Sequence, residues 1–356
     1  MRRHLVVLLL LVGMLAAACR QEPTPVRRPR TPPPSPSPTP EPVLCPLTGL
    51  EPPPGVDINR PAIGVKIDNH PMARPQTGLE LADIVYEELV EGGITRFLAM
   101  FHCGDAADLG PTRSARAVDP DLLVQYAPAL FAYSGGSPNV LAKVAGTAGV
   151  IDLKHGNNSS AYSRRRGRSA PHNLYTSTDR IRSLPLAAGV VGPPKTGLVF
   201  DRSLAASPAS PVTPASPPSP PAGAPAQPAP AGNKVSFSYS GAGSAVSYAY
   251  DAAGRRYLRS FAGQPHNSAS GAQLSAVNVV VLKVQVDRRG KSPEILVNGG
   301  GEATVLRLGQ AIQGSWNRPA LTDQTKLVDA AGQPIKLAPG NVWINLVPND
   351  RPVTVE

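Results

Sequence analysis

The sequence predicts an α+β protein, with an N-terminal α/β domain of sandwich type followed by a small, mainly antiparallel β domain. Two observations support this fold class. In the first part of the folded region, strand-like and helix-like runs alternate, which is typical of α/β layers. In the second part, short runs of β-branched and aromatic residues are separated by turns containing Asp and Gly, which is typical of a small sheet or barrel.

Two proline-rich stretches set the expected domain boundaries. Residues 20–43 and 205–232 are dense in proline together with Ser, Thr or Ala, and such segments favour extended, unpacked chain. The first is expected to be a tether. The second is expected to be a flexible connection between domains, or a long insertion near their junction. Folded domains are therefore predicted at 44–204 and 233–356.

Helix signals occur three times in the first domain. Residues 79–91 carry apolar side chains at i, i+3 and i+7 and end at a glycine pair, which predicts a helix. A second helix is expected to open at 119–121, where Pro takes the N1 position between two acids. A third is expected after Ser137, a predicted N-cap. The strands expected in this domain cover 61–68, 95–102 and 129–134.

The second domain has strand signals almost throughout. Its runs alternate or are strongly β-branched, and Asp-Ala-Ala-Gly turns separate two pairs of them. The expected strands cover 235–239, 245–250, 256–261, 277–286, 304–308, 311–316 and 341–347.

The N-terminus predicts export and lipid anchoring. A short basic segment precedes an apolar run of roughly eleven residues, which is too short to span a bilayer but suits a signal peptide. Small residues then precede Cys19, as in a bacterial lipobox, so residues 1–19 are expected to be a lipoprotein signal peptide with Cys19 diacylated. The alternative is an ordinary signal peptide with a chance cysteine. Lipidation places the protein on the extracytoplasmic face of the cell membrane.

Charge and cysteine content agree with an envelope location. The net charge is +10 and the pI about 9.7, which favours anionic lipids, anionic cell-wall polymers or acidic glycans as partners. Nucleic acid is not expected, because no nucleic-acid motif is visible. The basic run 164–168 is typical of a solvated loop. Because exported cysteines are often paired, we predict a disulfide between Cys45 and Cys103.

Nine short segments of the N-terminal part form a specific combination of motifs: 46–50, 59–61, 67–71, 73–76, 82–87, 91–96, 110–116, 135–138 and 170–175. Together they resemble the YerB-like family of bacterial lipoproteins, which has N-terminal and C-terminal domains of uncharacterised function. The resemblance covers nearly all of 45–356. It is weaker in the C-terminal part, where Ser268 stands in place of an expected acid, and this puts a metal or acid–base role of His266 in doubt. The resemblance implies no reaction.

The first candidate site follows a predicted strand. Asp68, Asn69 and His70 lie where that strand ends, and ligands of α/β sheets bind outside the carboxyl ends of strands. Arg74 and Gln76 in the same loop suit carboxylates and sugars. The alternative is a turn held by bonds between side chains and the backbone.

The second candidate is an anion site. A glycine turn before Ser137 would leave unpaired N–H groups at the start of a helix, a geometry that favours anions. Arg113 and Arg116 could add guanidinium groups. The alternative is ordinary turn and cap chemistry.

The third candidate is the segment that carries His172, Asn173 and Tyr175. His172 could act as a general base or donate a ligand bond, although a lone histidine is more often structural.

A fourth feature is an acidic stripe. Asp83, Glu87 and Glu91 would form one face of the predicted helix, which is usually a solvated face. There are two functional alternatives. Glu87 or Glu91 could pair with Arg96 or Arg113, or two of these acids could serve as the carboxylate pair of a glycoside hydrolase.

Known catalytic and cofactor motifs are absent from the sequence. It has no Gly-x-Ser-x-Gly, HExxH, CxxC or P-loop pattern, and its histidines do not have metal-ligand spacing. No metal or cofactor is therefore expected, and no catalytic residue is assigned. Three hypotheses remain: a lipoprotein that binds an anionic or glycan envelope ligand, a cell-wall hydrolase or transferase using His172 or His70, and a scaffold for another envelope protein.

Overall fold

The computed structural model describes residues 42–187, 190–205 and 232–356. The predicted signal peptide with Cys19, nearly all of the predicted tether and nearly all of the 205–232 segment lie outside the described residues. Within these residues, no helix combines the length and apolar character needed to cross a bilayer.

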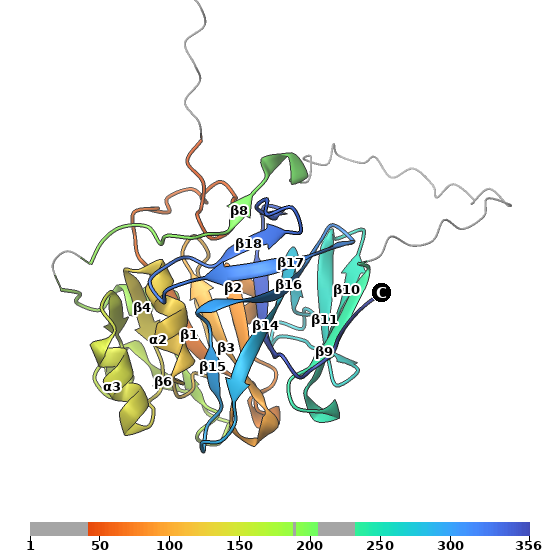
Figure 1. Cartoon of the computed structure of the whole chain (residues 1–356). Helices are drawn as coiled ribbons and strands as arrows, with labels where there is room; N and C mark the ends of the chain where they lie inside the picture. Colours follow the sequence, from red (N-terminus) through yellow and green to blue (C-terminus); the bar gives the residue numbers. More distant parts are fainter. Residues whose placement is uncertain (1–41, 188–189, 206–231) are drawn as a thin grey trace, which may run out of the picture. The chain divides into compact units, whose positions relative to one another are not determined.

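An eleven-stranded mixed sheet forms the centre of the unit 42–356 (Figure 1). Ten strands follow the order β18-β17-β16-β14-β20-β2-β3-β1-β4-β5, and β15 pairs with β14. The strands are β1 (Ala62–Asp68), β2 (Ile84–Leu89), β3 (Thr95–Phe101), β4 (Ala129–Ala132), β5 (Val150–Asp152), β14 (Asn278–Asp287), β15 (Glu294–Leu296), β16 (Gly299–Arg307), β17 (Gln310–Arg318), β18 (Lys326–Asp329) and β20 (Val342–Pro348).

The two predicted domains share this sheet. β2 pairs in parallel with β20, which pairs in parallel with β14, so the five strands that precede the 205–232 segment and the five path strands that follow it join at the β20–β2 pair. The described residues of Pro42–Glu356 form one compact unit. The two predicted regions, 44–204 and 233–356, therefore each contribute strands to the same sheet. The physical reason is that every residue of β2 and β20 is buried, and such strands need a neighbour on each side.

A smaller, antiparallel sheet packs on one face of the large one. It has the order β12-β11-β10-β9-β21, with β13 on β11. Aromatic side chains join the two layers: Trp343 of β20 meets Phe97 of β3 and Tyr248 of β10 edge-on, with ring centroids 5.6 and 6.1 Å apart. The strands are β9 (Lys234–Ser238), β10 (Ala245–Asp251), β11 (Arg256–Phe261), β12 (Gln264–Pro265), β13 (Ser275–Ala276) and β21 (Val353–Val355).

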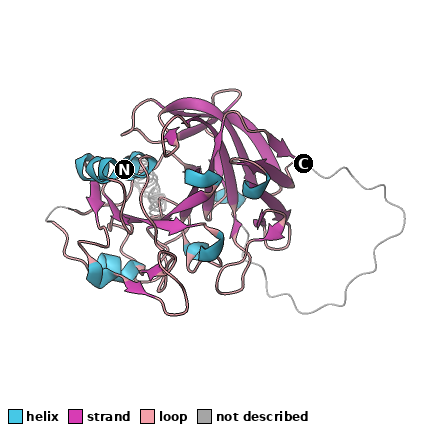
Figure 2. Cartoon of the chain, turned by 90° about the horizontal axis from the view of Figure 1, so that it is seen from below, coloured by secondary structure: helices cyan, strands magenta, loops and turns pink. Residues whose placement is uncertain are grey.

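The helices are short and lie outside the sheets (Figure 2). α2 (Val118–Leu123) and α3 (Pro138–Gly146) belong to the core on the other face of the large sheet, where Leu122 contributes beside Met100. α4 is Thr178–Arg182. Two small pairs complete the strands: β6 (Ser163–Arg164) with β7 (Leu174–Tyr175), and β8 (Val199–Phe200) with β19 (Lys336–Leu337).

The fold is α+β but richer in strand than predicted. Strands take 38% and helices 14% of the described residues, and the strict alternation of strand and helix expected for 44–204 is not present. The predicted helix 79–91 is wrong: a 3-10 turn (Leu79–Leu81) precedes strand β2. A strand buried on both faces carries apolar residues on both, which hides the period of two that marks a strand.

The direction of the strands creates one edge where loops gather. β14, β20, β2, β1, β4 and β5 run parallel, and β3 lies antiparallel between β2 and β1. The carboxyl ends of the six strands therefore meet along one side of the sheet, called here the carboxyl edge. Loops at such an edge are the usual place for ligands in α/β sheets.

The structure joins Cys45 and Cys103 in a disulfide. The bond links the segment that enters the folded unit to the loop after β3, where the sequence had placed it. Asp83 fixes the same loop, because its carboxylate accepts hydrogen bonds from the backbone N–H groups of residues 102–104.

Candidate functional site

Asp68 and His172 meet at the carboxyl end of β1, although they lie 104 residues apart. The backbone of residues 111–112 pairs with the end of β1, and Thr112 N–H donates to the carbonyl of Leu174 in β7. This brings His172 Nδ1 to 2.7 Å from Asp68 Oδ2. Because a carboxylate only accepts, Nδ1 carries the proton, and Nε2 of the neutral ring is an acceptor.

His70 stacks on His172. The ring centroids are 4.6 Å apart and the planes are inclined by 16°. His70 Nδ1 accepts a hydrogen bond from the N–H of Met72, so the proton of the neutral ring lies on Nε2. The two stacked rings therefore present one acceptor nitrogen, from His172, and one donor nitrogen, from His70.

Two arginines complete this group. Arg113 Nε lies 3.1 Å from Asp68 Oδ2, the oxygen that also binds His172. Arg96 is the second residue of β3, in register with Asp68 on β1, and its Nη1 donates to the carbonyl of Ser114 at 2.9 Å. We call Asp68, His70, Arg96, Arg113 and His172 the arginine–histidine cluster.

The cluster contains two arginines, Arg96 and Arg113, but only one carboxylate, Asp68, so its positive charge is not fully balanced. Arg96 is only 6% exposed, yet in the part of the chain that the structure describes no carboxylate lies within ion-pairing distance of it. Burial, together with the charges of Arg116 and Arg113, lowers the pKa of Arg96 to about 10. A buried cation without a paired anion is costly, so the cluster favours an added anion.

A hollow of about 260 Å³ adjoins the cluster and contains two further predicted residues, Arg116 and Ser137. Ser114 links the hollow to the cluster, because its carbonyl accepts hydrogen bonds from both Arg96 and Arg116. Arg116 pairs with Glu91, and the Ser137 side chain makes no bond to the helix that it precedes. The lining residues are Glu91, Ser114, Ala115, Arg116, Gly136, Ser137, Val140 and Ser292.

This hollow continues into a larger one of about 400 Å³ beside α2, α3 and residues 290–296. Arg116, Ser137, Val140 and Ser292 line both. The two hollows therefore form a continuous groove along the carboxyl edge.

Asn69, Arg74 and Gln76 lie on the opposite face of the sheet. Asn69 Nδ2 donates to Thr95 Oγ1 at 2.7 Å, and its Oδ1 accepts from Gln76 Nε2 and Arg74 Nε, both at 3.0 Å. Arg74 also stacks over Phe261, 3.8 Å from the ring centre. The structure therefore separates these three residues from the cluster.

These residues join a hydrogen-bond network that the sequence did not reveal. Thr95 donates to Glu87, which Arg259 Nη2 binds at 2.9 and 2.7 Å. Arg259 also donates to His266 Nδ1, and His266 Nε2 donates to Gln76 Oε1 at 2.9 Å. The hydrogen bonds close a ring, called here the polar ring: Asn69, Gln76, Glu87, Thr95, Arg259 and His266.

Both nitrogens of His266 are used inside the ring. Burial, then the charges of Arg259 and Arg74, lower the pKa of His266 to about 2. His266 is therefore a neutral structural residue. The acid that was expected at position 268 is not needed to hold the imidazole, because Arg259 and Gln76 already bind its two nitrogens.

Asn173 and Tyr175 support the loop that carries His172. Asn173 Oδ1 accepts from Arg164 at 2.8 Å, and its Nδ2 donates to the carbonyl of Arg168. Tyr175 is buried under the guanidinium of Arg165, which also pairs with Asp108. Much of the basic run 164–168 therefore forms hydrogen bonds and ion pairs within the folded chain.

The predicted acidic stripe does not form, because its residues lie on a strand and in the loops beside it. Glu87 faces the polar ring, Glu91 pairs with Arg116, and Asp83 binds backbone. Its neighbour Glu88 instead joins Lys66 and Asp119 on the other face, in a triad with no exposed side chain. Burial and the charge of Asp119 raise the pKa of Glu88 to about 7, although Lys66 opposes the shift.

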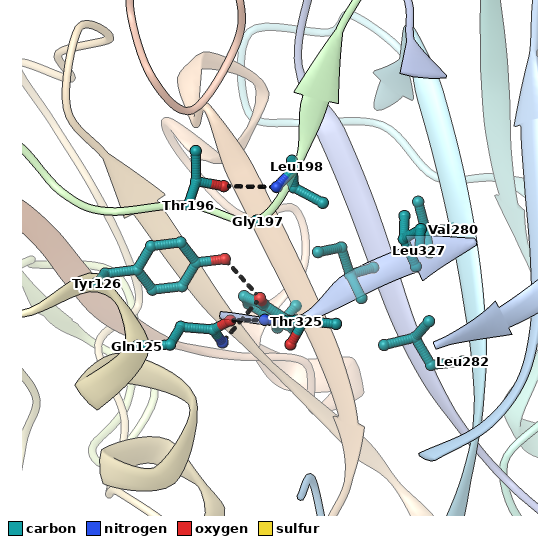
Figure 3. A pocket seen from close by; sticks show the side chains of 11 residues that line it. Gln125, Tyr126, Thr196, Gly197, Leu198, Val280, Leu282, Thr325 and Leu327 are labelled. Carbon is teal, nitrogen blue, oxygen red and sulfur yellow. Dashed lines mark hydrogen bonds between the residues drawn. The ribbon is translucent and has the colours of Figure 1, made fainter. Parts of the chain in front are cut away.

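A small pocket lies against strands β2, β14 and β20 and is lined by none of the five cluster residues (Figure 3). Its volume of about 10 Å³ is that of a single water site. The hydroxyls of Tyr86 and Tyr126 are 2.6 Å apart there, and Gln125 Oε1 accepts from the N–H of Thr325 at 3.0 Å. Its size excludes an organic ligand.

Comparisons with known proteins agree with the resemblance seen in the sequence. Two family models match: "Protein of unknown function (DUF3048) N-terminal domain" at residues 47–190, and its C-terminal domain at 235–344. The chain belongs to the DUF3048 family. Four members of the polar ring fall in the first matched region and two in the second, so the ring joins the two parts of the family's sequence.

A relative and a solved structure support this assignment. The chain is 29% identical over 311 residues to "Putative lipoprotein YerB" of Bacillus subtilis (strain 168), covering 85% of this chain and 86% of the relative. The crystal structure of YerB protein from Bacillus subtilis matches with a TM-score of 0.69 and 27% identity, over 88% of this chain and 99% of that chain.

Proposed function

We propose that this DUF3048 protein is a lipid-anchored extracytoplasmic protein that binds an anionic group of a cell-envelope polymer at the arginine–histidine cluster. The observation that carries the proposal is Arg96, a buried arginine beside Arg113 without a carboxylate partner in the described residues. Charge-assisted hydrogen bonds from guanidinium groups to carboxylate or phosphate are among the stronger polar contacts in proteins. An anion would compensate the buried charge.

The anchoring part of the proposal is supported by the lipobox at Cys19 and by the name of the Bacillus relative. Two acyl chains on Cys19 would hold the folded unit stably at the membrane. Cells that express the chain should incorporate labelled palmitate, and the Cys19→Ala variant should not. Unlabelled wild-type protein in the cell interior would contradict this part.

The binding part is tested by calorimetry with purified anionic cell-wall polymers. The Arg113→Ala variant loses one charge-assisted contact, so it should bind the polymer about tenfold to a hundredfold more weakly. Arg202→Ala is the matched control, because it removes the same charge from an exposed arginine that pairs with Glu51. Equal binding by wild type and Arg113→Ala would remove the site, and in-cell crosslinking to another envelope protein alone would favour the scaffold hypothesis.

A second candidate is a cell-wall hydrolase or transferase with His172 as general base. The 2.7 Å contact between Asp68 and His172 favours it, because a carboxylate that orients an imidazole is a recurring catalytic arrangement. His70 suits this role less, since its Nδ1 is engaged by the Met72 N–H. Digestion of purified cell walls by wild type, but not by His172→Ala, would support catalysis.

A further inference from the structure

The hydrogen-bonding groups of the cluster are not all of one kind. Arg96, Arg113 and Nε2 of His70 are donors, as an anion requires. In the neutral imidazole, His172 Nε2 is an acceptor instead, because Nδ1 donates its proton to Asp68. In the described part of the chain, no group donates a hydrogen bond to this nitrogen. A bare oxyanion has nothing to donate to it.

This acceptor lies beside the guanidinium group of Arg113. His172 Nδ1 and Arg113 Nε both contact Asp68 Oδ2, at 2.7 and 3.1 Å. Both side chains keep a small exposed part, 9% for His172 and 23% for Arg113. A ligand that reaches Arg113 from solvent therefore also reaches the imidazole next to it.

We infer that the ligand carries a hydroxyl group next to its anionic group: the hydroxyl donates to His172 Nε2, and the anion accepts from Arg113 and Arg96. The inference rests on the proposed anion binding and names its chemical class, a hydroxyl-bearing oxyanion. Polyol phosphates and sugar carboxylates both have this chemistry.

The hydroxyl also explains why Asp68 is placed where it is. Asp68 partly neutralises Arg113, which weakens the site for a simple anion. The same carboxylate fixes the tautomer of His172, which selects for a donor on the ligand. A site for simple anions would be stronger without Asp68, whereas a site for hydroxyl-bearing anions needs it.

Matched pairs of probes separate the two kinds of ligand. The full chain, purified in detergent, is titrated with glycerol phosphate against n-propyl phosphate, and with glucuronate against cyclohexanecarboxylate. Each pair differs in its hydroxyl groups and keeps the anion. We expect the hydroxyl-bearing member to bind about tenfold more tightly, the effect of one well-placed hydrogen bond. The better pair identifies phosphate or carboxylate as the anion.

Two substitutions of His172 test the role of Nε2. In His172→Asn the amide can keep the bond to Asp68 but has no atom at Nε2, so the preference for the hydroxyl-bearing probe should disappear. In His172→Gln the longer amide can offer its oxygen there, so part of the preference should return. His155→Asn, a histidine stacked edge-on against Tyr162, is the control and should keep the full preference.

Nitrogen NMR of the wild type gives a measurement that does not depend on the variants folding. At alkaline pH, where imidazoles are neutral, the Nε2 signal of His172 should be that of an unprotonated nitrogen and should move with glycerol phosphate more than with n-propyl phosphate. A protonated Nε2, or a preference that His172→Asn retains, overturns the inference. Equal binding within both pairs overturns it while the proposed function stands. If none of the four anions binds, the proposed function fails as well.

Discussion

Two groups of buried polar side chains sit at the same end of the large sheet, on opposite faces, and they differ in how well their charges are paired. They begin at adjacent residues, Asp68 in the arginine–histidine cluster and Asn69 in the polar ring. In the ring, Arg259 meets the carboxylate of Glu87 with two hydrogen bonds. In the cluster, Arg96 is almost as deeply buried and meets a backbone carbonyl. Burial alone therefore does not distinguish a structural arginine from a binding one, whereas the missing carboxylate does.

The largest expected effect separates these two arginines by stability. Arg259→Ala leaves the buried carboxylate of Glu87 without its cation, and breaking such a pair costs about 3 to 5 kcal/mol of unfolding free energy. Arg96→Ala removes a buried cation that has no such pair, so its cost should be clearly smaller. Urea unfolding of both variants measures the difference. Equal losses would remove the contrast between ring and cluster.

The sequence predicted the individual strands better than their assembly. β1, β3 and most strands after residue 233 form where short apolar or alternating runs predicted them. The ring was missed because Glu87 and Arg259 are 172 residues apart and were assigned to different domains. Asp68 and His172 were each singled out for local reasons, but only the pairing of residues 111–112 with β1 and with β7 brings them together. Long-range register of this kind leaves no local pattern in the sequence.

The pH dependence of stability gives a smaller effect, on the ring side of the comparison. The pKa of His266 is about 2 in the folded state, against about 6.5 for an ordinary histidine. Unfolding therefore takes up a proton below about pH 6.5, and stability falls as the pH falls from there toward about 2. Between about pH 4.5 and 6, this group alone contributes a slope of roughly 1.4 kcal/mol per pH unit.

Urea unfolding at several pH values in this range tests the assignment. The His266→Gln variant keeps polar atoms near Gln76 but cannot take up the proton, so its slope should be lower by about that amount. An unchanged slope would mean that His266 is protonated in the folded protein, and that the ring is not closed as described.

The smallest expected effect concerns Ser137, on the cluster side. A serine that caps a helix typically contributes about 1 kcal/mol, but Ser137 makes no side-chain bond to α3. Ser137→Ala should therefore change the unfolding free energy by less than about 0.5 kcal/mol. Calorimetric binding of polymer should nevertheless weaken, because Ser137 lines the groove. A full capping loss in thermal unfolding would assign the hydroxyl to the helix instead.

The position of β20 has a consequence for how the chain matures. β2 has β3 on one side, which follows it directly in the chain, and β20 on the other, which comes far later in the sequence. During synthesis, one row of backbone N–H and C=O groups on β2 therefore has no strand partner until β20 has been made. A chain truncated before β20 would leave this edge of β2 exposed, open to pairing with other chains. Such truncated chains are expected to aggregate, although they keep most of the residues of the N-terminal part.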